Sequence, residues 1–81
     1  MKVNVLFFGA TAEAAGQKKI EFETADGRIA GEVFQEILDA FPALKEQGRT
    51  LLFSVNQEYA SGSETVREGD ELAVFTPVSG G

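Results

Sequence analysis

Apolar and polar residues alternate along this chain with two different periods, and each period predicts a different kind of element. A period of two predicts strands over residues 3–9, 18–23, 51–56 and 71–76. A period near 3.6 over residues 28–40 predicts one long helix. The apolar stripe of this helix consists of Ala30, Val33, Phe34, Ile37, Leu38 and Phe41.

Shorter signals lie between these elements. Residues 10–15 are rich in alanine and predict a short helix, with Thr11 as its N-cap and Gly16 as its end. Asp26 is the best candidate N-cap of the long helix. Gly31 within that helix is explained either by a close approach to the sheet or by simple tolerance of a residue that costs about 1 kcal/mol relative to Ala. Pro42 ends the helix or begins a short turn that runs to Gln47 and Gly48. Three further segments are predicted, namely a turn at 57–58 before a short strand at 59–60, a loop at 61–63, and a turn at 67–70 with Gly69 at positive φ.

The order strand, strand, helix, strand, short strand, strand predicts an α+β fold of the β-grasp, or ubiquitin-like, type. In this arrangement a mixed sheet has one main helix packed on one face, and the first and last strands are central and parallel. The helix is expected to cover Val3, Val5, Phe7, Leu72 and Val74. Residues 1–75 form the predicted domain, and residues 76–81 form a flexible C-terminal tail that ends in Gly-Gly.

One long helix covers one face of a sheet, so the second face is expected to be bare. Strand parity places Leu6, Phe8, Ala73 and Phe75 on that face, and Tyr59 joins them from the sheet edge. An exposed apolar cluster on a small domain is typical of a partner interface. The alternative is that the 10–15 helix or the 57–66 loop folds over the cluster.

The composition argues against several classes of binding and catalytic function. Thirteen acidic residues against seven basic ones give a net charge of −6, which argues against binding to nucleic acid or to an anionic membrane. With no Cys and no His, the chain has no disulfide, no thiolate ligand and no Ser–His or Cys–His catalytic pair. We therefore expect no metal site and no cofactor bound by this chain. The apolar run at residues 5–8 is too short for a signal peptide or a membrane span, so we expect a cytoplasmic protein.

The last residues carry the candidate chemistry. The C-terminal segment contains Pro77, which has no N–H to donate, and it stops on Gly80 and Gly81, which have no side chains. Chance or an expression remnant accounts for the two glycines about as well as function does. With no His or Cys in the chain, however, the carboxylate of Gly81 is the most plausible reactive group, and our hypothesis is that the folded domain carries it.

Several motifs, taken in order along the chain, resemble one known family. These are Val5-Leu6-Phe7-Phe8-Gly9, Ser54-Val55-Asn56-Gln57, Glu68-Gly69-Asp70-Glu71-Leu72-Ala73 and Pro77-Val78-Ser79-Gly80-Gly81. They resemble the small subunit of molybdopterin synthase, the MoaD family of ubiquitin-like sulfur carriers. The chain departs from the family at Thr11-Ala12, where an Arg is common, and at Thr76, where a second Pro is common.

The resemblance implies a covalent cycle on Gly81. An ATP-dependent, E1-like adenylating enzyme activates the terminal carboxylate with ATP and Mg²⁺, and sulfur then converts it to a thiocarboxylate. The tail is inserted into the large subunit of molybdopterin synthase, where sulfur passes to cyclic pyranopterin monophosphate for molybdenum cofactor biosynthesis. The assembly is a heterotetramer, and the small subunit is not an enzyme by itself. The resemblance assigns Thr76, Pro77, Val78, Ser79 and Gly80 to the inserted tail, and Phe8, Tyr59 and Phe75 to the partner interface. Strand parity adds Leu6 and Ala73 to that interface.

Three other readings stay open from the sequence. A ubiquitin-like protein modifier uses the same C-terminal activation to form isopeptide bonds with lysines. A thiamine-pathway sulfur carrier also ends in Gly-Gly, although its chain is usually shorter and lacks the Pro-Val-Ser run. The third is a plain interaction module with an idle tail.

Overall fold

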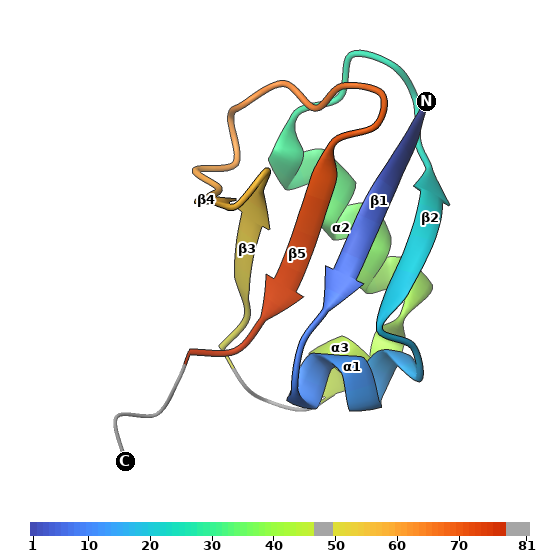
Figure 1. Cartoon of the computed structure of the whole chain (residues 1–81), viewed down its shortest axis with the longest axis vertical. Coiled ribbons are helices and arrows are strands. Elements are labelled where there is room, and N and C mark those ends of the chain that lie inside the picture. The colour runs from blue at the N-terminus through green and yellow to red at the C-terminus, as the bar shows by residue number, and fades with distance from the viewer. Residues whose placement is uncertain (47–49, 78–81) are drawn as a thin grey trace.

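The structure is a computed structural model that describes residues 1–46 and 50–77, and it consists of a five-stranded sheet with three helices (Figure 1). The elements in chain order are β1 (Lys2–Phe7), α1 (Ala10–Ala15), β2 (Lys19–Glu23), α2 (Ala30–Ala40), α3 (Pro42–Glu46), β3 (Leu52–Val55), β4 (Glu58–Tyr59) and β5 (Glu71–Phe75). Every predicted helix and strand is present, with ends shifted by one or two residues. The predicted Gln47 and Gly48 end of the turn lies outside the described residues.

The sheet has the strand order β2-β1-β5-β3-β4. β1 and β5 are parallel neighbours at its centre, and the other pairs, β1–β2, β3–β5 and β3–β4, are antiparallel. In Figure 1, α2 crosses behind this sheet, and α1 and α3 lie at the end where β1 and β5 finish. This is the β-grasp arrangement, so the predicted fold class and the central position of the first and last strands are confirmed.

The core lies between α2 and the sheet face that it covers. The inward residues of β1 and β5, as predicted, are at most 2 % exposed, and they are Val3, Val5, Phe7, Leu72 and Val74. Ala30, Val33, Phe34 and Ile37 of α2 pack on them, while Leu38 and Phe41 are partly buried at its margin. Each large apolar side chain that is fully buried contributes about 1.5–3 kcal/mol, so this one layer supplies most of the driving force for folding.

The start of α2 differs from the prediction. The N-cap is Ile29 and not Asp26, and the Glu32 carboxylate accepts a hydrogen bond from the Ile29 amide at 3.2 Å. Asp26 instead forms an ion pair with the N-terminal amine at 3.2 Å. A side chain three residues inside the helix thus takes the capping role, and Asp26 lies too far before the first turn to do so.

The first turn of α2 is held by the loop that precedes Val66. The Ala30 amide donates to the Glu64 carbonyl at 2.8 Å, and the Gly31 amide donates to the Gly62 carbonyl at 2.9 Å. A Cβ on Gly31 would lie 3.2 Å from that Gly62 oxygen. Gly31 therefore permits a close approach to a loop, and the predicted approach to the sheet is wrong.

We expect Gly31→Val to destabilise the fold by about 1–3 kcal/mol, because the added atoms press on a backbone carbonyl that cannot rotate away. Urea unfolding monitored by circular dichroism measures the change. The control is Gln35→Val, which places the same β-branched residue at an exposed position of the same helix. Equal losses in the two variants would contradict the close approach.

Glu64 holds the loop in the shape that caps α2. Its carboxylate accepts hydrogen bonds from the amides of Ser61 at 2.9 Å and Gly62 at 2.7 Å. The bond from the Ser61 amide is the main cause that lowers the pKa of Glu64, and the Gly62 amide adds to it. The carboxylate form is therefore favoured by the fold.

This shift predicts a pH dependence of stability. Because the pKa of Glu64 is lowered in the folded state, its contribution is complete above the ordinary pKa of 4.5 and is lost as the pH falls through the folded value. We expect Glu64→Gln to lower the urea midpoint near neutral pH and to match the parent chain in acid. Glu21→Gln, at an exposed position of β2, is the control for the loss of one negative charge. A gap of constant size at all pH values would refute the assignment.

The β3–β4 turn is one residue earlier than predicted. Asn56 and Gln57 both have positive φ, of 50° and 71°, which is the geometry of a two-residue hairpin turn. β4 is consequently Glu58–Tyr59 and not 59–60. The predicted positive φ of Gly69 is confirmed at 82°.

Candidate functional site

The face of the sheet that α2 leaves open carries the predicted apolar cluster. In register, Leu6 lies beside Ala73, Ala73 lies beside Ser54, and Ser54 lies beside Tyr59. Phe75 lies beside Leu52, and Phe8 follows the end of β1. The predicted placement of Leu6, Phe8, Ala73 and Phe75 on one face is therefore confirmed.

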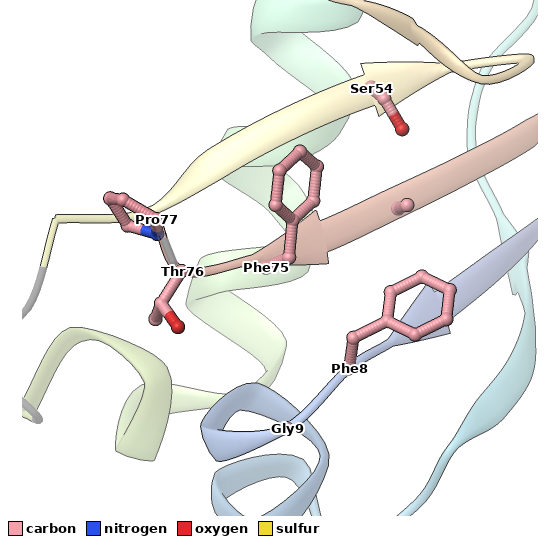
Figure 2. Close-up of a pocket in the computed structure, with 7 residues that line it drawn as sticks. Phe8, Gly9, Ser54, Phe75, Thr76 and Pro77 are labelled. Carbon is pink, nitrogen blue, oxygen red and sulfur yellow. The ribbon is translucent and has the colours of Figure 1, made fainter. Parts of the chain in front are cut away.

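A groove runs across this face at the end where β1 and β5 finish. It has a volume of about 530 Å³ and is lined by Phe8, Gly9, Ser54, Ala73, Phe75, Thr76 and Pro77. Figure 2 shows the rings of Phe8 and Phe75 on adjacent segments, with Ser54 on the next strand. Ala73 and Ser54 are small and almost fully buried, so they form a low floor between larger neighbours. The groove is hollow because small residues alternate with phenylalanines across the strands.

The groove brings together five of the residues predicted for the site, namely Phe8, Ala73, Phe75, Thr76 and Pro77. Leu6 lies next to Ala73 in register but does not line the groove. Tyr59 is also outside it, yet its ring centroid is 5.9 Å from that of Phe75. Val78, Ser79, Gly80 and Gly81 lie outside the described residues.

Neither of the two segments that offered an alternative, the 10–15 helix and the 57–66 loop, folds over the groove. Phe8 is 52 % exposed and Tyr59 is 74 % exposed, which is unusual for large apolar side chains. The 10–15 helix, α1, contacts α3 and the ends of β1 and β5. The 57–66 loop is held at the start of α2, where its Glu64 and Gly62 carbonyls accept hydrogen bonds from the first amides of that helix. The cluster is therefore open to a partner.

Sequence reasoning missed three residues here. Gly9 and Ser54 line the groove, and strand parity along β3 could have placed Ser54, since Phe53 and Val55 face the core.

Thr11 was predicted as an N-cap, but the N-cap of α1 is Gly9, with φ of 57°. Thr11 lies inside the helix and is fully buried. Its hydroxyl lies 2.9 Å from the Phe8 amide, 2.8 Å from the Phe8 carbonyl and 2.7 Å from the Val74 carbonyl.

None of the described residues that line the groove carries a charge, and charged groups gather elsewhere. None of its seven lining side chains titrates near neutral pH, so it offers no general acid or base. Among the described residues, ion pairs lie on the α2 side and at the N-terminus, and the hydrogen bond from Lys45 is the main cause that lowers the pKa of Asp39.

In residues 1–46 and 50–77 no three acidic side chains are grouped so as to hold a metal ion. No helix within those ranges is both long and apolar enough to cross a membrane.

The opposite end of the open face carries charged side chains, with more acidic than basic residues. Glu21 and Glu71 flank Asn4 in register, one on each neighbouring strand. Within the described part of the chain neither carboxylate has an ion pair. The open face thus changes from apolar near the groove to charged at the far end, where Lys2 also lies beside Glu23 in register.

The tail begins at the apolar end of this face. Thr76 and Pro77, its first two residues, line the groove directly after β5. The four residues that follow Pro77 in the sequence can span about 13 Å when fully extended, at roughly 3.3 Å each. A partner that contacts Thr76 and Pro77 is therefore separated from Gly81 by at most this length of chain.

Known proteins share this chain's sequence and fold. The model of the ThiS family matches residues 5–81. The molybdopterin synthase sulfur carrier subunit of Chlamydomonas reinhardtii is 37% identical, and the match covers 100% of both chains. The crystal structure of SAMP1 from Haloferax volcanii has a TM-score of 0.87 at 28% identity and also covers 100% of both chains.

A further solved structure shares the fold. It is the complex of subunits 1 and 2 of the molybdopterin-converting factor from Helicobacter pylori, which covers 100% of both chains with a TM-score of 0.71 at 24% identity. At that identity the likeness concerns the fold alone. From the family match and the 37% identity over the full length, the chain belongs to the ThiS family, together with the molybdopterin synthase sulfur carrier subunits that it resembles from end to end.

Proposed function

We propose that this protein is the sulfur carrier subunit of a molybdopterin synthase and that the carboxylate of Gly81 carries the sulfur. The observation that carries the proposal is the match, over the whole chain, to a sulfur carrier subunit that is 37% identical. The Gly-Gly end and the apolar groove at the base of the tail are what such a carrier needs.

The proposed chemistry begins with a carboxylate that is a poor electrophile. An adenylating enzyme of the E1-like type joins it to AMP from ATP, with Mg²⁺ on the phosphates and pyrophosphate as the leaving group. A sulfur nucleophile at the oxidation level of sulfide then attacks the acyl carbon and displaces AMP, so that a thiocarboxylate remains on Gly81 with no change of oxidation state. A thiocarboxylate is more acidic than a thiol, so its sulfur is ionised at neutral pH and needs no neighbouring base. Because Gly81 has no side chain, attack on the acyl carbon is not crowded.

The proposed partner is the large subunit, which receives the tail in a heterotetramer and supplies the catalytic side chains. Phe8, Tyr59 and Phe75 form the apolar contact, with Leu6 and Ala73 beside them. Thr76 to Gly80 form the arm that reaches cyclic pyranopterin monophosphate. The lack of any acid or base in the groove supports a role as donor and not as catalyst. Because the cycle consumes ATP, we place it in the cytoplasm.

Phe75→Arg is expected to leave the domain folded and to abolish binding to the large subunit. The side chain is partly exposed, so a charge there costs little in the free protein but is desolvated without a partner in the complex. Size-exclusion chromatography of the mixed subunits measures the effect. The matched control is Gln35→Arg on the far side of the molecule, which should assemble normally. Assembly of Phe75→Arg at the parent affinity would refute the interface.

Mass spectrometry of the protein from its native host is expected to show a thiocarboxylate on Gly81. The mass increases by the difference between sulfur and oxygen, and fragmentation must place the increase on the C-terminal peptide, because oxidised Met1 adds nearly the same mass. Deletion of Gly81 should remove the modification and abolish molybdenum cofactor synthesis in a complementation assay. Normal synthesis by that deletion would contradict the proposal.

A second candidate function is protein modification. The observation that favours it is the likeness to SAMP1 of Haloferax volcanii, a protein named small archaeal modifier protein 1 in a second structure. In that case Gly81 forms isopeptide bonds with lysine side chains. Gly-Gly remnants on lysines of other proteins, lost when Gly81 is deleted, would establish this function. A defect in thiamine synthesis alone would instead indicate the thiamine-pathway carrier.

A further inference from the structure

The hydroxyl of Thr11 joins three parts of the chain at the base of the tail. Thr11 belongs to α1, and its Oγ1 is 2.9 Å from the amide of Phe8, which follows β1. The same oxygen is 2.7 Å from the carbonyl of Val74, which precedes Phe75 in β5. The side chain is fully buried, so no water replaces these contacts.

This hydroxyl acts where the backbone ladder ends. The parallel pairing of β1 with β5 stops at Phe7 and Val74, and the next amide, that of Phe8, is 3.4 Å from the Val74 carbonyl. A bond of that length is weak. Thr11 accepts from the Phe8 amide, and its one proton is shared between the Phe8 carbonyl at 2.8 Å and the Val74 carbonyl. The hydroxyl of Thr11 thus links the segment after β1 to β5, just beyond the last backbone pair of the two strands.

We propose that Thr11 is a positioning residue for sulfur transfer, because it fixes the direction in which the tail leaves the domain. It acts through Phe8 and Val74. Phe8 forms one wall of the groove, and Val74 fixes the position of Phe75, which forms the other wall, and of Thr76, which follows Phe75. The inference rests on the proposed function, since it assigns a part in sulfur delivery to a residue that is fully buried and does not line the groove.

The test compares Thr11→Val, which keeps the shape and removes the hydroxyl, with Thr11→Ser, which keeps the hydroxyl. Thiocarboxylated protein is mixed with saturating large subunit and cyclic pyranopterin monophosphate, and the single-turnover rate is measured. We expect Thr11→Val to lower this rate by about 10- to 100-fold, the range that a misplaced reacting group costs. Thr11→Ser should stay close to the parent rate.

Ile37→Val separates positioning from mere stability, because it weakens the core on the covered face without touching the groove. It should transfer sulfur at the parent rate. A parent rate for Thr11→Val at saturation would overturn the proposal.

Amide hydrogen exchange provides a readout that does not depend on the proposed function. The Phe8 amide should exchange faster in Thr11→Val than in Thr11→Ser or Ile37→Val, and the NMR shift of the Thr76 amide should change only in Thr11→Val. If the parent protein transfers no sulfur, the proposed function fails, while unchanged Phe8 exchange and Thr76 shifts would overturn the positioning role by themselves. Should Thr11→Val not fold, Thr11→Ala removes the same hydroxyl without pressing a methyl group on the two carbonyls.

Discussion

The parallel pairing of β1 with β5 is the constraint on which the rest of this structure depends. It joins the first and last strands at the centre of the sheet, so β2 and β3 are added on either side of them, and α2 must cross one face. Central strands are held by neighbours on both edges, which makes them the least mobile part of a sheet. Thr76 and Pro77, which directly follow β5, consequently leave the sheet from one of its two central strands.

Most of this fold could be predicted from the sequence because strand alternation and the α2 stripe both follow burial. Val3, Val5 and Leu72 are apolar for the same reason that they are buried. The failures concern polar contacts between segments distant in the sequence. Asp26 looked like an N-cap, but Glu32 and the Glu64 carbonyl satisfy the α2 amides. A local pattern cannot show which carbonyl a distant loop will present.

The candidate site divides in the same way. The parity of the strands placed Phe8 and Phe75 on one open face, and both side chains line the same groove there. The hollow between them depends on Ser54 and Ala73, which lie side by side on the neighbouring strands β3 and β5. This pairing depends on the register of β3 against β5. Thr11 was misassigned because a hydroxyl near a helix start usually caps it, whereas here the residue lies two positions after the N-cap Gly9 and bridges two strands. The roles of Val78 to Gly81 remain proposals based on the family.

The shared location of the groove and the tail has a kinetic consequence. Thr76 and Pro77 are part of the groove wall, so any protein that holds this surface also controls access to the last residues. In the proposed cycle the adenylating enzyme and the large subunit must therefore bind one after the other and cannot form a complex of three. Each round of delivery then includes two dissociation steps. A surface of modest apolar area, with no charge in its hollow, suits a carrier whose residence time on each partner has to be short.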